Sequence, residues 1–210
     1  MSYLNDTMLT ELCERHQLVQ PFDPARVNPA SIDLALGREF VNLSDSLISY
    51  WFDHPDPHEE GGWNYAEPGE RFKADKVELR PNRALLATTA ERVAIPASGV
   101  EVPMRFTTRD GVSECVASRW IEACTGELRL KSSAARNGLD HALAGWIDPG
   151  FDGTLTLELH AHRPIELLAG KCYVQLVVAT MLAAPARSYQ QTGRYVGESA
   201  VGAVLAKEDR

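Results

Sequence analysis

Hydrophobic and polar residues alternate in short runs along the chain after residue 79. The runs are rich in Val, Thr, Ile and Leu, and turn pairs such as Asp110-Gly111, Asp152-Gly153 and Ala169-Gly170 separate them. Many short strands divided by frequent turns are typical of a β-sandwich or a β-barrel. The pattern therefore predicts a mainly β fold.

The N-terminal part of the chain follows a different pattern. Residues 5–16 predict a short helix, because Asn5 can cap it and apolar residues repeat at helical spacing. Residues 28–37 predict a strand, and the polar, irregular stretch 43–75 predicts long surface loops. No internal repeat or linker stands out, so residues 1–210 are expected to form a single domain.

Composition narrows the classes of protein. With 210 residues, 44% of them hydrophobic, the chain can bury a sizeable core, which excludes a disordered chain or a small disulfide scaffold. The net charge of −8 argues against nucleic acid as a partner, so any phosphate ligand must meet a local cluster of cations.

The expected location is the cytoplasm. No apolar run approaches the length of a membrane helix, so we expect no membrane partner, and the first residues do not have the pattern of a signal peptide. The four cysteines include no CxxC pair, which favours reduced thiols in a cytoplasmic protein.

Two histidine pairs are candidate zinc ligands. His160 and His162 would point to one face of a strand, and His54 and His58 lie in a polar loop. A zinc site needs three or four convergent ligands, and no cysteine pair joins either group. The zinc deaminase pattern, HxE followed by PCxxC, is also absent. We therefore expect no zinc.

The segment LKSSAAR, residues 130–136, concentrates groups that bind phosphate. Lys131 and Arg136 are cations, and Ser132 and Ser133 supply hydroxyl groups. Such a turn can hold an oligophosphate if backbone amides also point inward. A solvated turn with scattered charge is the alternative.

A turn and a strand follow this segment. The turn begins at Asp148, and in the strand Thr154, Thr156 and Glu158 share one face while the leucines between them share the other. Glu158 is either a solvent-facing carboxylate or a general base that activates water, a role that needs partial burial.

Together these segments resemble the dCTP deaminase family, a branch of the trimeric dUTPase superfamily. The resemblance covers about a third of the chain directly, and its block at residues 130–159 is the most specific. Four stretches carry it: NPASIDLALG (28–37), LRPNRALLATTAERVAIP (79–96), LKSSAARNGLDHALAGWIDPGFDGTLTLEL (130–159) and PIELLAGKCYVQL (164–176).

The resemblance implies a dUTPase-like distorted jelly roll or β-barrel with a short N-terminal helix. It implies a homotrimer whose active sites lie between subunits. It also implies metal-free hydrolytic deamination of dCTP to dUTP and ammonia, with Mg²⁺ bound only to the triphosphate of the nucleotide.

The resemblance assigns roles to single residues. Glu158 is the catalytic carboxylate. Ser132 and Arg136 are grouped with it as catalytic residues and also bind the phosphates, and one serine reaches the reacting region as well. The remaining residues bind the nucleotide: Lys131, Ser133, Ala134 and Ala135 with the phosphates, Asp148 with the 3′-hydroxyl, Thr156 and Leu157 with the base through their backbone, and Gln175, Tyr189, Arg194 and Glu198 at further positions, the last three on a flexible C-terminal lid at about 188–210.

Four departures from the family pattern limit the comparison. Glu198 stands where Gln is usual and would repel phosphates, Leu143 stands where Thr is usual, and Lys131 replaces an arginine that could bind phosphate through two bonds. The connection after residue 100 is longer than is usual in the family, and this extra length predicts an additional hairpin at about 100–128. Cys115 and Cys124 are expected to face each other across it.

Several activities share this scaffold. A bifunctional deaminase would continue to dUMP and pyrophosphate, and Gly145-Trp146 favours it, since such members have Gly and an aromatic residue there. A plain dUTP pyrophosphatase is disfavoured, because Glu158 lies in TLEL and no Phe follows Phe151. A non-catalytic nucleotide-sensing trimer and a deaminase of a modified cytosine nucleotide remain alternatives, the second because of Leu143.

Overall fold

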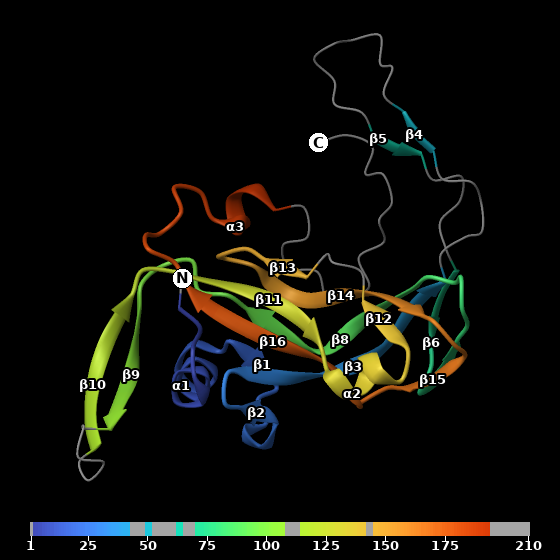
Figure 1. The fold of residues 1–210 in the computed structure, drawn as a ribbon. Coiled ribbons are helices and arrows are strands. Elements are labelled where there is room, and N and C mark those ends of the chain that lie inside the picture. Colours follow the sequence, from blue (N-terminus) through green and yellow to red (C-terminus); the bar gives the residue numbers. More distant parts are fainter. Residues whose placement is uncertain are drawn as a thin grey trace.

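The computed structural model of the chain describes residues 2–42, 49–51, 62–64, 70–107, 114–141 and 145–193. The largest element is one curled antiparallel sheet with the strand order β12-β14-β8-β3-β16-β11-β13 (Figure 1). The predicted mainly β fold is confirmed. The sheet comprises β1 (Val19–Gln20), β2 (Val27–Asn28), β3 (Ser31–Asn42), β6 (Glu70–Lys73), β8 (Leu85–Ala94), β11 (Cys124–Leu130), β12 (Leu139–His141), β13 (Trp146–Ile147), β14 (Asp152–Ala161) and β16 (Cys172–Thr180).

The remaining elements lie outside that sheet. Three strand pairs form separate two-stranded sheets: β9 (Val100–Thr107) with β10 (Glu114–Ile121), β7 (Lys76–Leu79) with β15 (Ile165–Leu168), and β4 (Ser49–Trp51) with β5 (Gly62–Asn64). The helices are α1 (Asp6–His16), η1 (Pro24–Arg26), α2 (Ser132–Arg136) and α3 (Tyr189–Thr192).

Helix α1 confirms the helix predicted at residues 5–16. Asn5 is the N-cap, and its side-chain oxygen accepts a hydrogen bond from the backbone N–H of Met8 at 3.1 Å. The helix ends where Gln17 adopts a left-handed conformation. Its buried side chains, Leu9, Leu12 and Cys13, join the main hydrophobic core.

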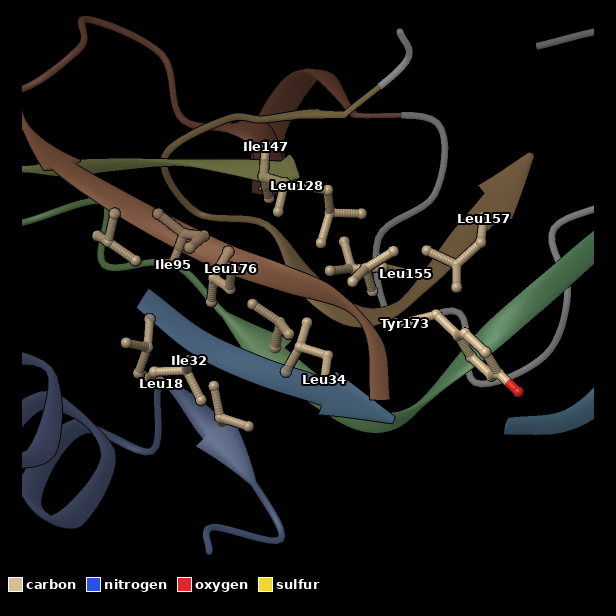
Figure 2. Packing of buried hydrophobic residues seen from close by; sticks show 14 of the residues in the cluster. Leu18, Ile32, Leu34, Ile95, Leu128, Ile147, Leu155, Leu157, Tyr173 and Leu176 are labelled. Carbon is tan, nitrogen blue, oxygen red and sulfur yellow. The ribbon is translucent and has the colours of Figure 1, made fainter. Parts of the chain in front are cut away.

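Strand β3 lies at the centre of the sheet, between β8 and β16. Leu34 and Leu36 are buried, and the side chains of Leu34, Leu155 and Leu176 pack among those drawn in Figure 2. The register of β3 shifts against both neighbours, once between Leu36 and Phe40 and once opposite Cys172. Such irregularities bend strands, which lets the sheet curl around its core.

Strand β14 has the alternation that the sequence predicted. Leu155, Leu157 and Leu159 are buried, while Thr154, Thr156 and Glu158 are half-buried on the other face. The leucine face therefore fixes which side of the strand presents Glu158.

The structure differs from the prediction in two regions. Within 43–75, expected to be loops, β6 pairs with β3 and β4 pairs with β5, because strands of three or four residues are too short to show alternation. The hairpin predicted at 100–128 ends at Ile121, and the strand from Cys124 belongs to the main sheet. Cys115 therefore lies opposite Phe106, and Cys124 opposite Thr180, so the two cysteines do not face each other.

Candidate active site

Helix α2 forms the turn predicted to bind phosphates. Its N-cap, Lys131, is anchored because its backbone N–H donates to the carbonyl of Tyr173 at 2.8 Å. Ser132, Ser133 and Arg136 are exposed. Arg136 has no ion pair with any residue that the structure describes. The turn therefore presents two hydroxyl groups and one guanidinium to solvent.

The two alanines of this turn contribute to its internal packing and hydrogen bonding. The side chain of Ala134 is buried, and the backbone N–H groups of Ala134 and Ala135 both donate to the carbonyl of Lys131, at 2.9 and 3.0 Å. Any contact between these two residues and a ligand would have to share amides that already have an acceptor.

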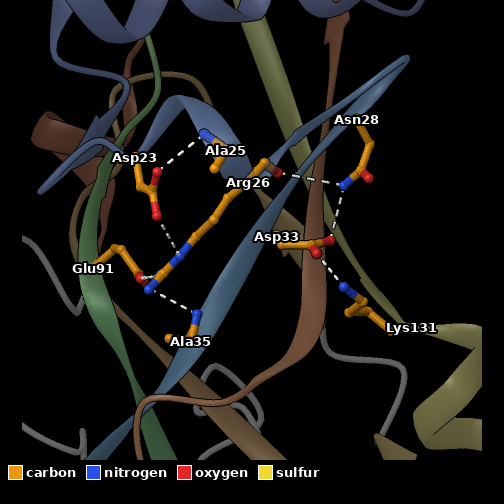
Figure 3. A network of polar contacts seen from close by, with 8 residues as sticks. All are labelled: Asp23, Ala25, Arg26, Asn28, Asp33, Ala35, Glu91 and Lys131. Carbon is orange, nitrogen blue, oxygen red and sulfur yellow. Dashed lines mark hydrogen bonds and ion pairs between the residues drawn. The ribbon is translucent and has the colours of Figure 1, made fainter.

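Asp33 on β3 holds the ammonium group of Lys131 in an ion pair (Figure 3). The side chain of Asp33 is 13% exposed, and its other oxygen accepts a hydrogen bond from Asn28 at 2.9 Å. Gln175 lies opposite Asp33 on β16 and accepts a bond from Ser31 at 3.2 Å. The structure thus brings Lys131 and Gln175 together around a carboxylate to which the sequence analysis gave no role.

Glu91, an acid that is fully buried, also contacts β3 (Figure 3). Its carboxylate accepts hydrogen bonds from the backbone N–H of Ala35 at 2.9 Å and from the guanidinium of Arg26. Burial raises the pKa of the Glu91 carboxyl, while the Ala35 amide and Arg26 lower it. Sequence reasoning missed Glu91 and Asp33. The available signal was an acid inside a predicted strand: Asp33 lies between Ile32 and Leu34, and Glu91 follows the run LLATTA.

Glu158 is connected to the phosphate turn through strand pairing. On β14 it lies opposite Leu86 of β8, with its side chain half-buried. The next residue, Leu159, lies opposite His141 of β12, and β12 packs against α2. The side chain of Leu157 is buried, which leaves its backbone as the part that could contact a ligand.

The turn at Asp148 meets the C-terminal segment. Gly150 has φ +88°, and a Cβ there would come within 3.3 Å of the backbone nitrogen of Tyr189. That nitrogen donates to the carbonyl of Pro149 at 2.9 Å, and the rings of Tyr189 and Phe151 lie 5.6 Å apart. Asp148 and Tyr189 are therefore neighbours, whereas Leu143, Arg194 and Glu198 lie outside the described residues.

The described part of the chain holds no group of three side chains placed to bind a metal ion. His162 lies 3.8 Å from Asp140, and His160 is exposed at the end of β14. His54 and His58 lie outside the described residues. None of the helices in the described ranges is long and apolar enough to cross a membrane.

A groove of about 430 Å³ lies away from these residues. It runs between α1 and the hairpin β9–β10, and Glu11, Gly99, Glu101 and Trp120 are among its lining residues. None of the residues that the sequence analysis assigned to the nucleotide lines it.

Comparisons with known proteins identify a family. The family described as dCTP deaminase-like matches residues 3–123 and 119–181. The protein named "dCTP deaminase, dUMP-forming" from Methanoculleus marisnigri is 33% identical over 87% of this chain and 83% of its own length. The protein of the same name from Persephonella marina is 29% identical over 93% and 92%, and the "dCTP deaminase" from Pyrococcus horikoshii is 29% identical over 87% and 86%.

One solved structure shares the fold. The crystal structure of 2′-deoxycytidine 5′-triphosphate deaminase from Agrobacterium tumefaciens superposes with a TM-score of 0.55 at 18% identity. The match covers 85% of this chain but only 48% of that longer chain. Since the matched residues include α2, the Asp148 turn and Glu158, and relatives match over most of their length, the chain belongs to the dCTP deaminase-like family.

Proposed function

We propose that this protein is a cytoplasmic, homotrimeric deaminase that converts dCTP and water to dUTP and ammonia. One observation carries the proposal: strand pairing joins a turn bearing Ser132, Ser133 and Arg136 to a strand that presents Glu158 half-buried. An anion-binding turn beside a carboxylate fits a reaction on the base of a nucleoside triphosphate. The names of the relatives from three organisms support the same substrate.

In the proposed reaction Glu158 acts as the general base. It accepts a proton from water while the water oxygen bonds to C4 of cytosine, and it passes that proton to N3. Glu158 then takes the proton of the new C4 hydroxyl and delivers it to the exocyclic amino group, so the C4 oxygen becomes a carbonyl, the C4–N bond breaks and ammonia leaves. Ser132 and Arg136 would hold the reacting region, and the backbone of Thr156 and Leu157 would hold the base. A positioned base of this kind contributes about 10²–10⁴-fold to a rate.

The chain would bind the triphosphate without a metal centre of its own. Asp33, the carboxylate paired with Lys131 of the phosphate turn, also accepts a hydrogen bond from Asn28. Mg²⁺ would arrive bound to the phosphate oxygens and would neutralise part of their charge. Lys131, Ser133 and Arg136 would supply the remaining positive charge and hydrogen-bond donors.

A homotrimer would complete each site. In Figure 1, α2 lies below the sheet and α3 lies above it beside β13. The groups that the resemblance assigns to one nucleotide thus belong to two well-separated parts of the chain. A neighbouring copy that brings its own Asp148 turn or its own α2 to this site would bring them together.

We further propose that the reaction continues to dUMP and pyrophosphate. In that step a second water would attack the α-phosphorus and break its bond to the bridging oxygen of the β-phosphate. The relatives from Methanoculleus marisnigri and Persephonella marina carry names that specify dUMP formation. Gly145-Trp146 at the start of β13 supports the same choice.

The test is incubation of the purified protein and Mg²⁺ with dCTP and, separately, with dUTP. Chromatography would follow ammonia, pyrophosphate and nucleotides. Formation of dUMP and pyrophosphate from dCTP supports the full proposal, and dUTP as the end product removes the second step. Turnover of dUTP alone, or of neither nucleotide, overturns the proposed deaminase. Glu158→Gln should lose at least about 10²-fold in ammonia release while it still binds dCTP.

A further inference from the structure

The geometry points to Trp146 as the residue that positions the carboxylate of Asp148. Its indole nitrogen Nε1 donates a hydrogen bond to Oδ1 of Asp148 at 3.1 Å. We infer that this bond aims Asp148 at the 3′-hydroxyl of the substrate sugar, so Trp146 helps to select a deoxyribose that carries that hydroxyl. The inference rests on the proposed function for the role of Asp148.

Strand geometry explains why the two side chains meet. Trp146 and Ile147 form β13, and side chains two residues apart in an extended chain point to the same side. Ile147 is buried, so Trp146 and Asp148 on either side of it both face outward. The indole N–H is then within reach of the carboxylate.

The backbone beneath this pair is held by three successive contacts with β11. Trp146 pairs with Glu127 of β11, and the carbonyl of Gly145 accepts a hydrogen bond from Leu128 at 2.7 Å. The hydroxyl of the buried Thr125 donates to the carbonyl of Ile147 at 3.0 Å. A fixed backbone leaves the Asp148 side chain as the part that still needs orientation.

The exposure of Trp146 indicates that its side chain positions Asp148 and does not pack in the core. The residue is 59% exposed, so its ring adds little to the core. An exposed carboxylate that must hold a substrate hydroxyl rotates freely unless something restrains it, and a donor from the preceding strand removes that freedom. Phenylalanine at this position would keep the ring and lose the donor.

The test compares Trp146→Phe with wild type on dCTP and on 2′,3′-dideoxycytidine triphosphate. Loss of a hydrogen bond to a carboxylate at an exposed position should lower kcat/KM for dCTP about tenfold. For the dideoxy substrate, which has no 3′-hydroxyl to hold, the loss should be less than about twofold. Equal losses on both substrates, or no loss on dCTP, overturn the inference.

Trp120→Phe is the matched control. Trp120 is 60% exposed, like Trp146, and it lies on strand β10 of the hairpin β9–β10, away from the candidate site. This variant should keep wild-type kcat/KM on both substrates. If it showed the same selective loss as Trp146→Phe, the effect would not come from the contact with Asp148, and the inference would fail.

A spectroscopic measurement tests the hydrogen bond apart from turnover. In a two-dimensional ¹H–¹⁵N spectrum, the indole signal that Trp146→Phe removes is that of Trp146. Asp148→Asn should move this signal more than it moves the Trp120 signal. An unmoved Trp146 signal overturns the positioning role even if the enzyme deaminates dCTP. A moved signal in a protein that turns over neither nucleotide would instead refute the proposed function and leave the contact intact.

Discussion

Replacing Glu91 by alanine should destabilise the protein, because it removes a buried acceptor from the centre of the sheet. Glu91 is 2% exposed and Ala35 is 1% exposed. The backbone N–H of Ala35 donates to Glu91 at 2.9 Å, beside the position where β3 and β16 shift register. In the alanine variant this N–H would have neither the carboxylate nor water as an acceptor.

The expected loss is about 2–3 kcal/mol at pH 7. An unsatisfied buried N–H costs about 1–3 kcal/mol, and the lost methylene group costs about 1 kcal/mol more. The Arg26 side chain is 32% exposed and keeps Asp23 at 3.4 Å, so its released guanidinium adds about 0–1 kcal/mol. Relief of the carboxylate from burial offsets about 1 kcal/mol.

Equilibrium unfolding in guanidinium chloride would measure this loss. Wild type and variant must be compared at one protomer concentration, since dissociation of an oligomer makes stability depend on concentration. If the free energy of unfolding of the alanine variant lay within about 0.5 kcal/mol of the wild-type value, with an unchanged m-value, the estimated cost of the unsatisfied Ala35 N–H would be refuted.

Glu91 should also make the free energy of unfolding depend on pH. Burial raises the pKa of its carboxyl above the ordinary 4.5, so between 4.5 and the folded pKa the native state binds more protons than the unfolded state. The free energy of unfolding therefore falls as pH rises through that window. Glu91→Gln lacks this titration, so wild type should lose stability relative to the Gln variant between pH 4 and pH 7. A constant difference would contradict the raised pKa.

Three further outcomes follow from the same structure. Asp33→Asn should cost about 1–2 kcal/mol in urea unfolding, since it breaks a partly buried pair with Lys131, and no loss would contradict that pairing. Gly145→Ala should lower the Tm, because its Cβ would lie 2.8 Å from the carbonyl oxygen of Leu128; an unchanged Tm would mean that β13 moves easily. Burial raises the pKa of the Cys124 thiol to about 12, so iodoacetamide at pH 8 should label Cys172 before Cys124, as peptide mass spectrometry can check.

The sequence was sufficient wherever a local pattern decides the structure. Helix α1 follows from a capping asparagine and helical spacing, and the alternation in β14 follows from the period of an extended chain. The turn at α2 could be placed because serines and cations gather there. Each of these features depends on residues that are neighbours along the chain.

The residue at which the hairpin after residue 100 ends could not be predicted from the local sequence. The segments 114–121 and 124–130 have similar strand character, yet the first pairs with β9 and the second with β16. Strand pairing is decided by which surfaces can be buried together, and that depends on residues far away in the sequence. The predicted hairpin therefore extended too far.

The sequence by itself determined the mainly β class, the positions of α1 and α2, the face that carries Glu158 and the family resemblance, because these reside in local periodicity and in contiguous motifs. Only the tertiary structure decided the partners of the buried acids. Asp33 meets Lys131, and Glu91 meets Ala35, across strands separated by dozens of residues. The order in which the strands pair creates those contacts, and no local pattern of hydrophobic and polar positions encodes which strand a side chain will face.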